Sequence, residues 1–199
     1  RRQRQMCIRD RNMPRFVYIS KVDEDNSDYN ATFTALREKY GNKIAPVVIP
    51  IWNSAHKVTG IIDVLNKRAY EMQNLKRVEI DVPADKVSVI EEFNDALKEA
   101  VAETDEALMD RFFEGGDFTY REMITGLHQG VKDLSLFPVL CGSGLTCLGS
   151  LMLMDNIIDL LLKLAHDENR CVIVVTHDLS VMDRADVVYR INDGLLERR

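Results

Sequence analysis

An apolar run that ends in a polar turn, FVYISKVD, occupies residues 16–23. Its first four residues are aromatic or β-branched, a composition that favours a β-strand. The segment 29–40 follows, with Phe33, Leu36 and Tyr40 at helical spacing. This order predicts a strand, a loop and a helix in succession, the unit from which α/β proteins are built.

The rest of the chain alternates in the same way. Strands are predicted at 46–51, 60–64, 68–72, 136–141, 171–176 and 187–191, and helices at 83–112, 120–131, 148–166 and 179–185. The segments 60–64 and 68–72 read as a hairpin-like pair, and Thr119 with Glu122 has the spacing of a capping box. Strands separated by helices predict an α/β fold with a largely parallel sheet.

Composition narrows the possible classes of protein. The 199 residues are 46% hydrophobic and 29% charged, with a net charge of −6, which gives little support to a nucleic-acid-binding surface. Four cysteines without metal-ligand spacing argue against zinc and against a disulfide framework, so a cytoplasmic location is expected. No apolar run reaches the ~18 residues of a membrane span. We interpret residues 1–12 as a non-native leader; a basic N-terminal arm is the alternative.

The turn SKVD at residues 20–23 directly follows an apolar strand, which is where GTPases place their Asn-Lys-x-Asp motif, and it resembles that motif. The two oxygens of a carboxylate at the fourth position, Asp23, match the N1–H and N2–H₂ donors of guanine, a pair that adenine does not offer. The methylenes of Lys21 can lie across the base while the ammonium stays in water. A polar turn that merely ends a strand is the alternative interpretation.

A second segment, FPVLCGS at residues 137–143, resembles the last nucleotide-contacting strand of elongation factor G, where Ser-Ala supplies a backbone N–H to guanine O6. Further segments resemble the subdomain inserted in that GTPase domain: GIIDV (60–64), VPAD (82–85), AVAETDEALM (100–109) and FEGG (113–116). The resemblance covers residues 14–161. It implies as parent a ribosome-dependent GTPase, or one of its ribosome-protection or elongation-factor-like paralogues. The residues that it implies for GTP binding are Ser20, Lys21, Asp23, Ser143 and Gly144.

Two substitutions depart from that family, and a major part of its site is missing. Ser20 stands in place of asparagine, and Gly144 in place of alanine. The 199 residues contain no glycine-rich loop that ends in Lys-Ser or Lys-Thr, the element that cradles phosphates in such proteins. The chain alone is therefore expected to be inactive in hydrolysis, with weak or no GTP binding and no bound Mg²⁺.

The C-terminal part carries a different signature. The segment CVIVVTHD at 171–178 resembles the strand and switch histidine of ABC-transporter ATPases, and the flanks extend this resemblance over 157–199. It implies that His177 is a vestigial switch histidine and that the parent had a membrane-protein partner. A β-branched strand with a polar end is the alternative.

These resemblances predict an incomplete P-loop-NTPase-type parallel sheet with an inserted α+β subdomain. The expected organisation is a partial GTPase domain at 13–161, with the insertion at about 46–131, followed by an ABC ATPase fragment at 162–199. The strands at 16–19 and 136–140 are both expected to be unpaired edges. Two alternatives stay open: an ATP-binding subunit of an ABC transporter, and an interaction module that binds no nucleotide.

Overall fold

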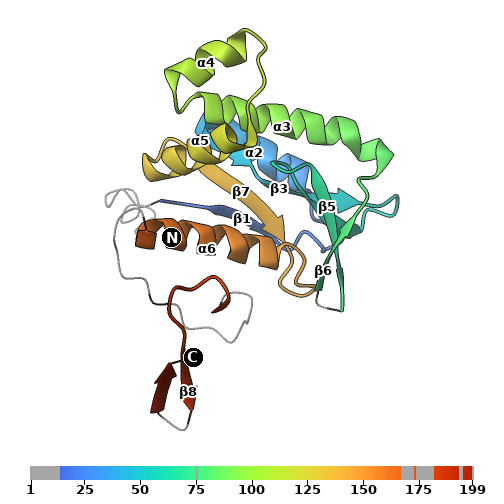
Figure 1. The fold of residues 1–199 in the computed structure, drawn as a ribbon. Coiled ribbons are helices and arrows are strands. Elements are labelled where there is room, and N and C mark those ends of the chain that lie inside the picture. The colour runs from blue at the N-terminus through green and yellow to red at the C-terminus, as the bar shows by residue number, and fades with distance from the viewer. Residues whose placement is uncertain (1–13, 75, 167–172, 174–181, 193–194, 199) are drawn as a thin grey trace. The chain divides into compact units, whose positions relative to one another are not determined.

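The computed structural model describes residues 14–74, 76–166, 173, 182–192 and 195–198 (Figure 1). The chain divides into two compact units, residues 1–153 and 154–199. The first unit contains a parallel sheet, an antiparallel sheet and the helices that pack on them, which confirms the α/β fold with a second, inserted sheet. In the described part of the chain, none of the helices has the length and apolar character needed to cross a membrane.

The parallel sheet has the order β1-β7-β2, formed by Val17–Ser20, Phe137–Gly142 and Ile44–Pro46. Strand β7 runs parallel to both neighbours, with Ser20 opposite Gly142 and Ile44 opposite Phe137. All residues of β7 after the first are buried. This explains why its sequence is a continuous apolar run, as expected for a parallel strand covered on both faces.

The central place of β7 corrects one expectation. Residues 136–140 were predicted to form an unpaired edge, but β7 lies between β1 and β2 and is paired on both sides. The prediction was wrong because order along the chain does not fix order across a sheet. Among the described strands, β1 pairs with β7 alone, so β1 is an edge here.

Hydrogen exchange should report this strand order. We expect the amides of Val139, Leu140 and Cys141 to exchange on the order of tenfold or more slowly than those of β1, because protection rises from sheet edges to the core. Residue-resolved exchange by NMR at neutral pH measures both sets. Equal protection of Ile19 and Leu140 would contradict the central position of β7.

The antiparallel sheet has the order β3-β4-β5-β6, formed by Val48–Trp52, Val58–Asp63, Arg68–Gln73 and Lys76–Ile80. The predicted pairing of 60–64 with 68–72 is confirmed as β4 and β5, and β6 is an additional strand. The run predicted as one strand at 46–51 is divided between β2 and β3. Val47 joins them: its N–H donates to the Val139 carbonyl at 2.9 Å, and its own carbonyl accepts from the Val64 N–H at 3.0 Å.

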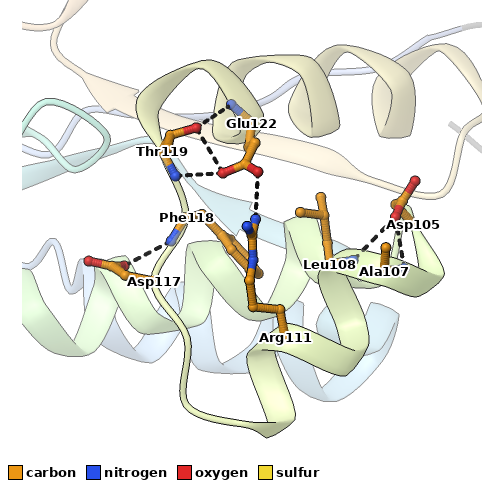
Figure 2. Close-up of polar contacts among 8 residues, drawn as sticks. All are labelled: Asp105, Ala107, Leu108, Arg111, Asp117, Phe118, Thr119 and Glu122. Carbon is orange, nitrogen blue, oxygen red and sulfur yellow. Dashed lines mark hydrogen bonds and ion pairs between the residues drawn. The ribbon is translucent and has the colours of Figure 1, made fainter.

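Within the described residues the helices are α2 (Tyr29–Tyr40), α3 (Val87–Ala102), α4 (Glu106–Phe113), α5 (Tyr120–Lys132) and α6 (Ser150–His166), with short 3-10 turns η1 (Gly41–Lys43) and η2 (Ala84–Lys86). The long helix expected to reach Phe112 is broken after α3. Asp105 explains the break, because its carboxylate accepts hydrogen bonds from the N–H groups of Ala107 and Leu108 and caps α4 (Figure 2).

Helices α3 and α5 cover the parallel sheet. Helix α3 packs against β2, α5 packs against β7, and the two helices contact each other (Figure 1). Helix α2 joins α3 through an aromatic cluster of Tyr29, Phe33 and Phe93, with ring centroids 5.2–6.0 Å apart. The Arg37 guanidinium adds an ion pair to Glu99 at 2.7 Å. The predicted insertion therefore contributes part of the core of the parallel sheet.

The predicted capping box of α5 is present. The Glu122 N–H donates to Thr119 Oγ1, the Thr119 N–H donates to Glu122 Oε2 at 2.8 Å, and Arg111 reaches across from α4 to Glu122 Oε1 at 2.6 Å (Figure 2). The Arg111 guanidinium, followed by the Thr119 N–H and hydroxyl, lowers the pKa of Glu122 from 4.5 to about 2. All three partners favour the ionised carboxylate.

This lowered pKa predicts a dependence of stability on acid. The folded state keeps Glu122 ionised where the unfolded chain takes up a proton, so the contribution of Glu122 is full above pH 4.5 and is lost as pH falls toward about 2. Glu122→Gln should flatten the fall in the free energy of unfolding over that range, measured by urea titration at several pH values. The exposed Glu114→Gln is the control, and an equal flattening by both changes would contradict the assignment.

The second unit contains a two-stranded antiparallel hairpin, β8 (Tyr189–Asn192) with β9 (Leu195–Arg198). A strand predicted at 187–191 corresponds to β8. In the same unit Arg184 forms ion pairs with Asp155 and Asp159 of α6. His177 and, except for residue 173, the predicted strand at 171–176 lie outside the described residues.

Candidate functional site

Two segments that are far apart in sequence meet at the carboxyl ends of β1 and β7. Ser20 lies opposite Gly142 in the parallel register, and the Val22 N–H is 3.5 Å from the Gly142 carbonyl oxygen. The turn 20–23 and the loop that begins at Ser143 therefore leave the sheet at the same edge. In open α/β sheets this edge is where ligands bind.

The turn after β1 is held by one buried side chain and short hydrogen bonds. Val22 is 1% exposed, and its carbonyl accepts from the Ser27 hydroxyl at 2.7 Å. The Glu24 N–H donates to the Lys21 carbonyl at 3.2 Å, and Lys21 has a φ of 64°. With Val22 fixed inward, Ser20 and Lys21 face solvent and Asp23 is half-buried.

The charged side chains of this turn differ in the contacts that they make. Lys21 Nζ lies 2.6 Å from Glu24 Oε1, which raises the pKa of Lys21, but both side chains are exposed. Ion pairs between exposed side chains contribute little to stability, so the lysine stem can be redirected at little cost. Within the described residues, the Asp23 carboxylate has neither a hydrogen bond nor an ion pair. Asp23 is therefore an acceptor available to a ligand.

Ser143 is buried, and its N–H and hydroxyl form hydrogen bonds within the protein. Its N–H donates to the Leu148 carbonyl at 2.8 Å, and its Oγ accepts from the N–H groups of Leu145 and Thr146 at 3.1 and 3.2 Å. A hydroxyl that accepts from the next turn is a common way to fix a loop. In this structure Ser143 shapes the loop, and its own N–H is already occupied.

Gly144 is exposed at the turn that Ser143 fixes, and its N–H has no acceptor among the described residues. A Cβ added here would meet no atom within 4 Å. The departure from alanine at this position therefore changes no packing contact. Gly144 supplies an accessible backbone donor at the strand edge that also carries Asp23.

Sequence reasoning missed the residues that close the loop at its far end. Leu148 accepts the Ser143 N–H, and Ser150 Oγ donates to the Ser143 carbonyl at 3.4 Å. The signal in the sequence is a second Gly-Ser pair, at 149–150, after the pair at 142–143. Of the other predicted functional groups, His177 lies outside the described residues. The described part of the chain contains no group of three or more His, Cys, Asp or Glu side chains placed to hold a metal ion.

Comparison with known proteins supports the fold more than any function. No protein-family model matches the chain. A crystal structure of a protein from Thermus thermophilus is similar to it, with a TM-score of 0.68 and 31% sequence identity. The match covers 78% of this chain and 23% of that protein, so this chain spans about a quarter of the length of its structural relative.

Proposed function

We propose that residues 14–153 form the base-reading half of a guanine-nucleotide site in a protein of the elongation factor G type. One observation carries the proposal: the parallel pairing of β1 with β7 brings the turn at Asp23 and the loop at Gly144 to one edge of the sheet. The two segments come from opposite ends of the first unit. Each alone is a weak motif, and their position at one sheet edge supports a shared base site.

The proposed recognition uses three groups. The Asp23 carboxylate accepts from guanine N1–H and N2–H₂, the Gly144 N–H donates to O6, and the Lys21 methylenes cover one face of the base. Adenine presents an amino group at C6 and an unprotonated N1, so it would leave both Asp23 and Gly144 unmatched. A polar group that a bound base covers but leaves unpaired costs ~1–3 kcal/mol, which is the source of the selectivity.

On this proposal the ligand is GTP or GDP, the working partner is the ribosome and the compartment is the cytoplasm. Phosphate binding would need a glycine-rich loop that the 199 residues do not contain. Without phosphate contacts, few interactions offset the ~4–15 kcal/mol cost of association. Affinity for this chain alone is therefore expected to be weak and to rest on the base.

A surface feature favours one of the alternatives, an interaction module. Phe113 and Tyr120, at the junction of α4 and α5, are 79% and 57% exposed. Exposed aromatic side chains are enriched at protein–protein interfaces. This alternative predicts binding of a protein partner with no effect of nucleotide. The ABC-transporter alternative depends on His177 and its neighbours, which lie outside the described residues.

Nucleotide binding by the purified chain tests the proposal. Ligand-observed NMR with GDP and ADP at millimolar concentration should show a preference for GDP. Asp23→Ala should lower GDP binding by about tenfold or more, since hydrogen bonds to a charged group contribute ~1.5–3 kcal/mol. Asp25→Ala, the same change on an exposed neighbour, is the control. Equal binding of GDP and ADP would overturn the proposal, as would equal losses in the two variants.

A further inference from the structure

The loop between β7 and α6 is closed by direct contact of two backbone segments. A Cβ on Gly149 would overlap the Cys141 carbonyl oxygen and lie 3.0 Å from the Gly142 Cα. Conversely, a Cβ on Gly142 would overlap the Leu148 carbonyl oxygen. The segment 148–149 therefore lies directly against the end of β7, at a distance that excludes any side chain larger than hydrogen.

Gly149 is required for a second reason. Its φ is +74°, in the left-handed region that residues with a Cβ rarely adopt. This conformation directs the chain from Leu148 into α6, where the Leu153 N–H bonds to the Gly149 carbonyl at 3.0 Å. Steric fit and backbone conformation thus specify glycine independently.

The contact holds the loop in the shape that exposes Gly144. Because Gly149 lies on β7, the Leu148 carbonyl reaches the Ser143 N–H at 2.8 Å. Ser143 in turn accepts from Leu145 and Thr146, which forms the turn around Gly144. We call Ser143, Leu148 and Gly149 the loop clasp.

We propose that the loop clasp positions the Gly144 N–H for the O6 atom of guanine, with Gly149 and Ser143 as its positioning residues. This inference rests on the proposed function. It divides the proposed base site into two halves, each held in place by different residues. The O6 half depends on the clasp, whereas the half that reads N1–H and N2–H₂ depends on Asp23 in the turn held by Val22.

Base analogues report the two halves separately. The 6-thio analogue of GDP replaces O6 by sulfur, a weak acceptor, and keeps N1–H and N2–H₂, whereas IDP keeps O6 and lacks N2–H₂. The wild-type chain should bind GDP about fivefold better than either analogue, the size of one hydrogen bond. Gly149→Ala should lose the preference over 6-thio-GDP and keep the preference over IDP.

A matched control separates positioning from general strain. Gly115 has a φ of +75°, and a Cβ there would meet no atom within 4 Å. Gly115→Ala therefore introduces the same backbone strain away from the site, and both preferences should stay at about fivefold, the size of one hydrogen bond. Ser143→Ala removes the clasp hydroxyl without a steric overlap. It should reproduce the loss of discrimination against 6-thio-GDP even if Gly149→Ala does not fold by circular dichroism.

The outcomes distinguish the inference from the function on which it rests. If the wild-type chain shows no preference for GDP over IDP and ADP, the proposed function fails and the inference fails with it. If the wild type is selective but folded Gly149→Ala or Ser143→Ala still discriminates against 6-thio-GDP, the clasp proposal alone is overturned. A folded variant that loses both preferences equally also overturns it, because that result indicates a general loss of the site.

Discussion

On the proposed function, Asp23→Asn is expected to exchange guanine for xanthine as the preferred base of this chain. The asparagine oxygen still accepts from N1–H, but its amide nitrogen is a donor that faces the N2–H₂ donors of guanine. Xanthine carries an oxygen at C2, which accepts from that amide. The substitution therefore turns the match with guanine into a mismatch and the mismatch with xanthine into a match, while the proposed contact of the Gly144 N–H with O6 is unchanged.

The expected change is large for a single substitution. Loss of a charge-assisted pair costs ~1.5–3 kcal/mol, which corresponds to about 10- to 100-fold in affinity for GDP. Competition between GDP and xanthosine diphosphate, followed by ligand-observed NMR, measures the ratio in one sample. Asp25→Asn serves as the control and should keep the guanine preference. An unchanged preference in Asp23→Asn would remove Asp23 from the base site.

Leu97→Ala should lower the free energy of unfolding by about 2–5 kcal/mol, the range for truncation of a buried leucine. Leu97 is 0% exposed in α3, the helix that packs on β2. The truncation removes apolar burial and leaves a cavity at a junction between α3 and the sheet, where neighbouring elements have little freedom to close it. Urea unfolding monitored by circular dichroism gives the change in midpoint and slope.

Leu145→Ala is the matched control for this measurement. Leu145 is 88% exposed on the loop after Gly144, so the same chemical change should alter stability by no more than about 0.5 kcal/mol. A loss of similar size in both variants would contradict the placement of α3 in the core. Equal slopes with different midpoints would show that the two variants differ in stability rather than in the extent of unfolding.

The elements best predicted from sequence are those that depend on neighbouring residues. Helix α2 spans Tyr29–Tyr40, the predicted range, and Asp28 caps it through a hydrogen bond to the Ala31 N–H. The capping box at Thr119 was predicted from spacing alone and is present. The β4–β5 hairpin was found because its strands are close in sequence. In each case the deciding contacts lie within a few residues.

Elements fixed by distant partners were predicted less well. Nothing in residues 136–141 shows that their strand lies between β1 and β2, because that order depends on which edges the other strands leave open. The apolar run at 46–51 gave no sign that it changes sheets at Val47. Strand β6 alternates charged and apolar residues over 77–80, a short pattern that could have revealed it.

The candidate site shows the same division. The resemblance to elongation factor G indicated that Asp23 and Gly144 belong together, and the structure places their segments at one sheet edge. It did not indicate that the N–H and the hydroxyl of Ser143 are already hydrogen-bonded to Leu148, Leu145 and Thr146. A hydrogen bond within a loop depends on how the loop folds, which a motif of two residues does not encode.

Val47 is a tie rather than a hinge between the parallel and the antiparallel sheet of the first unit. It is the one residue between β2 and β3, and it is hydrogen-bonded on one side to Val139 of β7 and on the other to Val64 after β4. Hinges need a few residues that can absorb large changes in φ and ψ. Here a swing of one sheet against the other would break at least one of these bonds, so a force applied to the antiparallel sheet reaches β7, the strand that leads to Gly144, through Val47 as well as through the packing of β3 on β7.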